Sequence, residues 1–212
     1  MGHKHLDKLT GLFGLLFAGA IAGLNAYSFE NNTVWYEIGI TTALDVIFSF
    51  TRGGLTNAMS DSHWDNSKTK QTLYISFGFV IVSFVFAVLV FLICIIGFIR
   101  KVSRAAKKFV LASCILVFVS NVFALLLFLM INRAFCDDLT DGIISSNFAN
   151  EIQKTKICSD FRGHYSGFGY NIYWKPEAGW ICELVATILS IFLIIVGSRI
   201  LHAKKHGYQV IR

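Results

Sequence analysis

Two long stretches of this chain contain no charged residue. Residues 74–99 and 109–131 are mostly apolar, and each exceeds the roughly 20 residues that a helix needs to cross a hydrocarbon layer about 30 Å thick. Within lipid, a single stretch satisfies all of its own backbone polar groups only as a helix. We therefore predict that both stretches are membrane-spanning helices.

Two further stretches, residues 9–27 and 178–201, also predict spanning helices. The first is short and rich in glycine, and the second contains one acid, Glu183, and one base, Arg199. The first stretch follows basic residues and could be a cleaved secretory signal, but we expect it to be retained. Because 55% of the 212 residues are hydrophobic and only 15% are charged, a soluble core of this size could not bury the apolar surface. The predicted fold class is an all-α membrane protein built on a bundle of four transmembrane helices.

The basic residues are unevenly distributed among the segments that connect these spans. Eleven of the 19 Lys and Arg residues, counting Arg199 at the end of the last span, but only one of the 13 acids, lie near the two ends of the chain or between the second and third spans. Basic residues near spans mark the cytoplasmic side. The cytoplasmic segments predicted in this way are residues 1–8, 100–108 and 202–212, and the outer loops are residues 28–73 and 132–177. The net charge of +6 is thus divided by membrane side, so the predicted partner is the lipid bilayer and no nucleic-acid partner is expected.

Both outer loops contain alternating apolar and polar residues. Between residues 36 and 50 the even positions are almost all apolar or aromatic, whereas the odd positions include Glu37, Gly39 and Asp45. A shorter copy of this pattern occupies residues 168–174. Because a period of two is typical of half-buried strands, we predict that both loops contribute to one small antiparallel β-sheet on the outer side of the bundle. An interfacial amphipathic helix at residues 34–50 remains the alternative.

The five cysteines differ in their predicted surroundings. Cys94, Cys114 and Cys182 lie in spans, whereas Cys136 and Cys158 are both in the second outer loop, on the oxidising side of the membrane. We predict a disulfide between Cys136 and Cys158, worth roughly 3 kcal/mol for a closed loop of about 20 residues. The alternative is two free or intermolecular thiols.

A possible glycosylation site lies in the first outer loop. Asn31, Asn32 and Thr33 form an N-x-T acceptor on the predicted outer side. The site follows the first span by only a few residues, where the membrane limits access for the modifying enzyme. The sequence therefore leaves the occupancy of Asn31 open.

Polar residues inside the predicted spans are few. Asn121 lies near the middle of the third span, where an interhelical hydrogen bond is the expected role. Glu183 lies near the outer end of the last span, and the sequence favours a hydrogen-bonded structural acid over an ion site there. The sequence contains no Cys/His metal spacing, and no histidine lies deep in a span as a haem ligand would. We therefore expect no enzymatic activity, no bound metal and no cofactor.

The first span has small residues on adjacent faces, which permits the backbone of a neighbouring helix to approach closely. The neighbour is either another helix of the same bundle or a second copy of the chain in a homo-oligomer. The small residues are Gly14, Ala18, Gly19, Ala22 and Gly23.

The order of features along the chain resembles that of the claudin and peripheral-myelin-protein superfamily. Trp35 lies in a strand-forming first loop, the cytoplasmic connection is short, and an aromatic segment at residues 167–180 (GFGYNIYWKPEAGW) leads into the last span. The resemblance implies four helices with an outer sheet. The chain departs from the claudin pattern because its first loop has no cysteine pair.

The end of the chain is similar to the Gly-Tyr-x-x-apolar sorting signal of lysosome-associated membrane proteins. Gly207, Tyr208 and Ile211 occupy the matching positions in a short tail on the predicted cytoplasmic side. Such a signal binds a clathrin adaptor as an extended segment. The resemblance implies residence in endolysosomal membranes, with or without the plasma membrane.

The sequence favours a non-enzymatic four-span protein that self-associates or binds partners through its outer loops to organise or adhere membranes. The alternative is an oligomeric pore-forming channel or a channel accessory subunit, for which the small residues of the first span and the acids of the outer loops argue. An enzyme would require Glu183, His164 and Asp160 to meet in one cavity.

Overall fold

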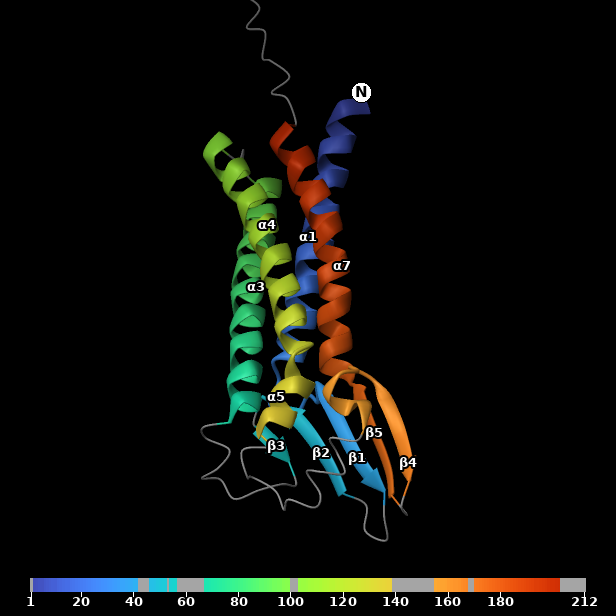
Figure 1. The fold of residues 1–212 in the computed structure, drawn as a ribbon. Helices are drawn as coiled ribbons and strands as arrows, with labels where there is room; N and C mark the ends of the chain where they lie inside the picture. Colours follow the sequence, from blue (N-terminus) through green and yellow to red (C-terminus); the bar gives the residue numbers. More distant parts are fainter. Residues whose placement is uncertain are drawn as a thin grey trace, which may run out of the picture.

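Four long helices and a small sheet make up the described structure (Figure 1). The helices are α1 (Gly2–Ser28), α3 (Lys68–Ile99), α4 (Arg104–Phe128) and α7 (Ala178–His202). The computed structural model describes residues 2–41, 46–52, 54–56, 67–99, 103–138, 155–167 and 170–202.

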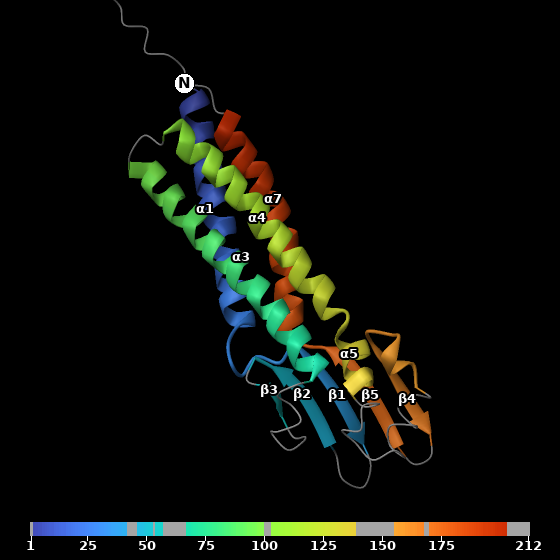
Figure 2. The ribbon, with the colours of Figure 1, turned by 60° about the vertical axis from the view of Figure 1, so that its left-hand side comes forward.

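The long helices form a four-helix bundle in which α1 and α4 each pack against both α3 and α7 (Figures 1 and 2). Large apolar side chains on the outer surface of every helix are exposed, among them Leu16, Val85, Leu126 and Ile188. A soluble protein rarely exposes so continuous an apolar surface, whereas lipid covers it. Among the described residues, four helices are long and apolar enough to cross a membrane. The protein is therefore an integral membrane protein, as predicted.

The helices extend beyond the apolar stretches because capping groups, and not hydropathy, decide where they begin. The Asp138 carboxylate accepts hydrogen bonds from the backbone N–H groups of Lys68 and Thr69, both at 2.8 Å, at the start of α3. The Ser103 hydroxyl accepts from the Ala106 N–H at 3.2 Å at the start of α4. Part of the predicted cytoplasmic connection is therefore helical.

The sheet has five antiparallel strands in the order β3-β2-β1-β5-β4. Residues of both outer loops contribute to it, so the predicted sheet is confirmed and the alternative helix at residues 34–50 is wrong. The strands are β1 (Tyr36–Thr41), β2 (Val46–Thr51), β3 (Gly54–Thr56), β4 (Gly163–Gly167) and β5 (Tyr170–Pro176).

The register of β1 against β2 explains why apolar and polar residues alternate in the sequence from residue 36 to residue 50 although two strands are formed. In the pairing of β1 with β2, Tyr36 lies opposite Phe50 and Ile40 lies opposite Val46. Even positions therefore pair with even positions and share one face of the sheet. The same face is continued in β5, where Trp174 lies opposite Ile38.

Two short helical segments lie against this face, between the sheet and the bundle. These are α5 (Ile131–Asp138) and the 3-10 helix η2 (Lys156–Cys158). The disulfide between Cys136 and Cys158 joins them across a Cα–Cα distance of 5.8 Å and confirms the predicted pair. The second outer loop is thus partly folded into a cover for the sheet.

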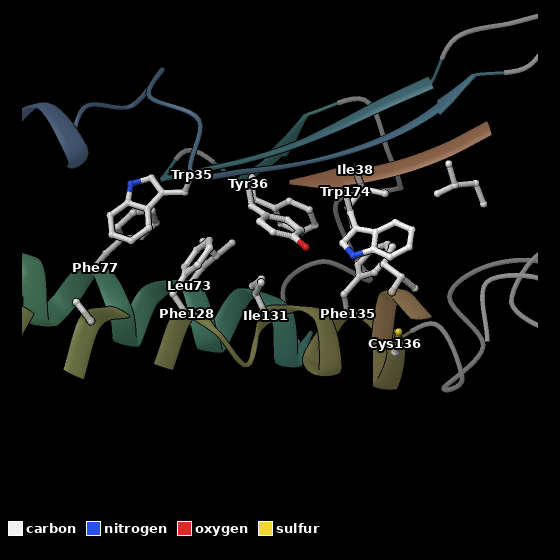
Figure 3. Packing of buried hydrophobic residues seen from close by; sticks show 14 of the residues in the cluster. Trp35, Tyr36, Ile38, Leu73, Phe77, Phe128, Ile131, Phe135, Cys136 and Trp174 are labelled. Atoms are coloured by element: carbon white, nitrogen blue, oxygen red, sulfur yellow. The ribbon is translucent and has the colours of Figure 1, made fainter. Parts of the chain in front are cut away.

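Aromatic side chains form the core between the sheet, α5 and the ends of α3 and α4 that lie nearest the sheet (Figure 3). Tyr36 packs against Phe50 and Phe128, with ring centroids 5.9 and 6.2 Å apart. Phe50 packs against Phe135 of α5 at 5.8 Å. Burial of several large aromatic side chains holds the sheet on the bundle.

Candidate functional site

Trp35 forms the junction between the sheet and the bundle. Its ring centroid lies 5.1 Å from that of Phe77 in α3 and 5.0 Å from that of Phe128 in α4 (Figure 3). Its indole N–H donates to the Ser28 carbonyl oxygen at the end of α1 at 2.6 Å. The ring also lies against Gly179 of α7, where a Cβ would collide with it. Trp35 therefore contacts all four long helices.

Backbone hydrogen bonds attach α7 directly to the residues before β1. The Glu177 N–H donates to the Trp35 carbonyl and the Gly179 N–H donates to the Val34 carbonyl, both at 2.9 Å. The Ser28 hydroxyl donates to the Gly179 carbonyl at 3.1 Å, which adds α1 to the same junction. The orientation of the sheet is therefore fixed relative to the membrane helices.

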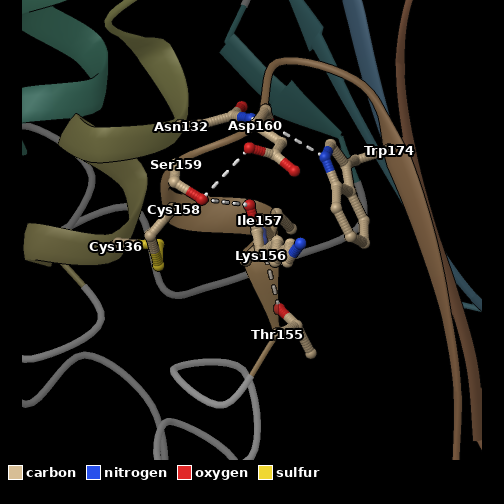
Figure 4. The surroundings of a disulfide bond; sticks show 9 residues. All are labelled: Asn132, Cys136, Thr155, Lys156, Ile157, Cys158, Ser159, Asp160 and Trp174. Atoms are coloured by element: carbon tan, nitrogen blue, oxygen red, sulfur yellow. Dashed lines mark hydrogen bonds between the residues drawn. A yellow bond between two sulfur atoms is a disulfide. The ribbon is translucent and has the colours of Figure 1, made fainter.

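The carbonyls of Asp160 and Phe161 anchor the segment that follows the disulfide (Figure 4). The Asp160 carbonyl accepts from the Asn132 side-chain amide at 2.7 Å and from the Trp174 indole at 2.8 Å. The Phe161 carbonyl accepts from the Tyr36 hydroxyl at 2.7 Å. Burial raises the pKa of Tyr36 well above its ordinary value, so this hydroxyl remains a donor.

The opposite face of the sheet is polar and centres on Tyr173 of β5. Its ring lies across Gly39, a position with no room for a Cβ, and its hydroxyl donates to Glu37 Oε1 at 2.7 Å. Lys175 Nζ lies 2.7 Å from Glu177 Oε1 and 3.9 Å from Glu37 Oε1. The hydrogen bond to Glu177 raises the pKa of Lys175. This face is therefore well ordered but not apolar.

Both edges of the sheet are open in the described part of the chain. The strand β3 lies at one edge and β4 at the other, and neither has a second strand neighbour among the described residues. In β4, His164 and Ser166 are exposed and Tyr165 is half-buried against the core. The sequence pattern predicted neither edge strand.

The polar residues of the spans face the interior of the bundle. Asn25 of α1 and Ser83 of α3, which the sequence analysis did not select, are fully buried and joined by a 2.8 Å hydrogen bond from Asn25 Nδ2 to Ser83 Oγ. Asn121 and Glu183 are also fully buried. Among the described residues, the side chains of Asn121 and Glu183 have no hydrogen-bond partner. The interhelical bond expected for Asn121 and the hydrogen-bonded role expected for Glu183 are therefore not observed.

Most of the small residues of α1 pack inside the bundle. A Cβ at Gly14 would lie 3.2 Å from Cys94 Sγ, and one at Gly19 would lie 3.2 Å from the Phe91 ring. Ala18 is fully buried and Ala22 packs against the same apolar cluster. Gly23 has open space beside it. Helices of the same chain therefore use most of this surface.

The other predicted positions lie apart from one another. Asn31 is exposed just beyond α1, while Thr33 of the same acceptor is buried and its hydroxyl donates to the Tyr27 carbonyl at 2.9 Å. His164 is exposed on β4 whereas Glu183 is inside the bundle, so the triad that an enzyme would require is not assembled. The tail signal of Gly207, Tyr208 and Ile211 lies outside the described residues.

No protein-family model matches this chain, and no curated protein matches its sequence.

Proposed function

We propose that this protein organises or adheres membranes by joining copies of itself through the outer sheet, without catalysing a reaction. The observation that carries this proposal is a five-stranded sheet that is firmly attached to the bundle and that, within the described part of the chain, is open at both edges. An open edge presents unpaired backbone N–H and C=O groups to another strand.

The edge strand β4 lacks the usual protection against such pairing. Soluble proteins commonly protect edge strands with lysine, proline or other charged residues. The β4 sequence, Gly163–Gly167, contains none of these and has three small residues and one histidine among its five positions. A second copy of the chain is therefore a suitable partner for this edge.

The strand directions determine how copies are arranged. The strands run obliquely away from the bundle (Figure 1), and because each strand is antiparallel to its neighbour, β3 and β4 point the same way. Copies side by side in one membrane would pair β4 with β3 as parallel strands. Two β4 strands pair in the antiparallel manner only when one molecule is inverted, as it is in a facing membrane. The β4 edge thus supports adhesion, and the two edges together support rows.

The test is clustering of lipid vesicles that carry the purified protein. Ser166→Lys places a charge on the edge strand and should abolish clustering, because a lysine on an edge strand opposes pairing with another strand. Thr41→Lys is the matched control, since Thr41 is exposed on the interior strand β1 and should leave clustering unchanged. Undiminished clustering by Ser166→Lys would refute pairing through β4.

The charges and the disulfide support a proposal for the orientation and the compartment. Arg104, Lys107, Lys108 and Arg199 lie in the helix ends opposite the sheet, and the disulfide lies between the sheet and the bundle. These observations support cytoplasmic termini and an outer or luminal sheet. The tail signal supports sorting by a clathrin adaptor to endolysosomal membranes. If Tyr208→Ala leaves the distribution between the cell surface and endolysosomes unchanged, the sorting proposal fails.

An oligomeric channel is the second candidate, and the acids of the outer loops favour it, because they would attract cations to the entrance of a pore. A pore through a single bundle is disfavoured, because the rings of Trp35, Phe77 and Phe128 lie across its outer end. Conduction would therefore need a pore between copies. Single-channel recording of the protein in planar bilayers tests this candidate.

A further inference from the structure

A layer of polar side chains crosses the bundle just inside the Trp35 junction. Each of the four long helices contributes one member, and all four are fully buried: Asn25, Ser83, Asn121 and Glu183. The surface of the bundle at this depth is apolar, so these are the groups least suited to lipid. Asn25 and Ser83 are joined by a hydrogen bond, whereas the side chains of Asn121 and Glu183 are buried without a partner among the described residues, which requires a chemical explanation.

The Trp35 contacts place the four side chains at similar depths. Trp35 touches Ser28, Phe77, Phe128 and Gly179, which therefore mark one level of the bundle. At a rise of about 1.5 Å per residue, Asn25 and Glu183 lie about 5 Å and 6 Å inward from that level, and Ser83 and Asn121 about 9 Å and 10 Å. The hydrogen bond between Asn25 and Ser83 joins two of the helices across this interval.

The layer has more hydrogen-bonding capacity than its own members use. Asn25 Oδ1, both amide atoms of Asn121 and both carboxylate oxygens of Glu183 are without partners among the described residues. The nearest hydroxyl on α7, that of Thr187, donates to the Glu183 backbone carbonyl at 2.9 Å and is thus already engaged. A carboxylate buried in this way is strongly destabilising if it stays charged and unpaired.

Compensating charge is not supplied by the surrounding elements. Along the helices, the closest bases are Lys70 on α3, Lys108 on α4 and Arg199 on α7, each at least 13 residues from the layer and so about 20 Å along the axis. On the sheet side, Lys175 is paired with Glu177 and the Arg52 guanidinium lies 3.9 Å from the Phe29 ring centroid. The neighbouring titratable groups are the Cys182 thiol beside Glu183 and the Tyr36 hydroxyl, which donates to Phe161. None of them brings a positive charge to Glu183.

Apolar side chains close the layer on both sides. Trp35, Phe77 and Phe128 belong to the buried aromatic cluster on the side of the sheet. Val90, Val117 and Leu193 belong to the buried apolar cluster on the other side. Water therefore screens this carboxyl group poorly, and a positive charge bound there is held strongly.

We propose that Glu183, together with Asn121 and Asn25, forms an intramembrane binding site for one monovalent cation. The cation is a proton held by the carboxyl group or an alkali-metal ion held by the carboxylate and amide oxygens. The site lies within a single bundle, so it does not depend on the pairing of sheets between copies.

The proton is tested by infrared spectroscopy of the wild-type protein in lipid vesicles. The carbonyl stretch of a protonated carboxyl group is separate from the bands of a carboxylate. A proton at Glu183 gives this band at neutral pH, and Glu183→Gln removes it. Glu30→Gln, which removes an exposed acid just beyond α1, keeps the band and serves as the matched control. If Glu183→Gln does not fold, Glu183→Asp is used, because the shorter acid shifts the band.

The alkali-metal ion is tested by thermal unfolding of the same proteins in sodium, potassium or N-methylglucamine chloride at equal ionic strength. A bound alkali ion raises the unfolding midpoint of the wild type above its value in the large organic cation. Glu183→Gln and Asn121→Ala lose this increase, whereas Glu30→Gln retains it. If an alkali-metal ion occupies the site, the infrared band of a protonated carboxyl group is absent from the wild type.

Two results would overturn the proposal. One is a wild type that shows only carboxylate bands at neutral pH and unfolds at the same temperature in all three salts. The other is a protonated band that Glu183→Gln leaves in place, together with no effect of the cation on unfolding. Either result would show that Glu183 holds no cation.

Discussion

Gly179 is the residue that allows the indole of Trp35 to enter the bundle. The two residues belong to different segments, and a Cβ on Gly179 would overlap the indole ring. The backbone there is also fixed by the bond from the Gly179 N–H to the Val34 carbonyl. The junction therefore has little capacity to relax around an added methyl group.

We predict that Gly179→Ala lowers the free energy of unfolding by about 1–3 kcal/mol, the usual cost of overpacking. Gly23→Ala is the matched control, because Gly23 is also helical but has open space beside it. Removing that glycine should leave stability unchanged or raise it by up to about 1 kcal/mol. Denaturant unfolding of both variants in one detergent measures the difference. Equal changes in the free energy of unfolding for Gly179→Ala and Gly23→Ala would show that the Trp35 ring leaves room for a methyl group at position 179.

Tyr36→Phe should lower the free energy of unfolding by about 1–2 kcal/mol, because the Phe161 carbonyl loses its 2.7 Å hydrogen bond. The same variant changes the dependence of stability on pH. Burial raises the pKa of Tyr36 in the folded protein, so the folded state keeps a proton that the unfolded state loses above its ordinary pKa of about 10. Wild-type stability therefore falls as the pH rises beyond about 10, and Tyr36→Phe should fall less steeply. Unfolding curves of both proteins across the alkaline range measure this; parallel curves would contradict it.

At the scale of elements, α5 and η2 are held beneath the sheet by one covalent bond and a few hydrogen bonds. The disulfide closes a sequence separation of 22 residues. The Asn132 amide still joins α5 to the Asp160 carbonyl at 2.7 Å. Loss of the disulfide should therefore loosen this cover without releasing it.

We predict that the double substitution Cys136→Ser and Cys158→Ser lowers the free energy of unfolding by about 3 kcal/mol. Hydrogen exchange should increase mainly at the backbone amides of α5 and η2. Cys182→Ser is the control, because that thiol is free and only partly buried. An equal loss of stability in Cys182→Ser would show that replacing a cysteine, and not breaking the disulfide, lowers the free energy of unfolding.

The sequence predicted those elements whose patterns are local. Alternation over residues 36–50 identified β1 and β2, because burial of one face requires a period of two. Strand β3 is too short for a pattern, and β4 has a single large apolar side chain, Tyr165, among five residues. Helix α5 escaped notice because its role depends on Asp138, whose carboxylate caps a helix that begins 70 residues earlier.

At the scale of the whole molecule, the site depends on how far each helix is rotated and how deep it lies. The sequence identified Asn121 and Glu183 as polar residues within spans, because polarity at membrane depth is visible in one dimension. It did not identify Asn25 and Ser83, and it assigned Asn121 a hydrogen bond that the packed helices do not provide. Only the packing of the helices decides which of these side chains lie at the same depth in the bundle. That depth is marked by Trp35, which belongs to the segment between α1 and β1 and not to a helix.

The orientation of the molecule can be tested at its two ends. The sheet lies at one end of the bundle and the start of α4 at the other (Figures 1 and 2). Ser166 is exposed on β4 and Ala105 is exposed in the first turn of α4, beside the basic connection that predicts the cytoplasmic side. A membrane-impermeant maleimide should therefore label Ser166→Cys on intact cells or right-side-out vesicles, and label Ala105→Cys only after permeabilisation. The wild type, whose free cysteines all lie in spanning helices, supplies the background. Labelling in the reverse order would place the sheet in the cytosol, where the disulfide would be reduced and the tail would be beyond the reach of a clathrin adaptor.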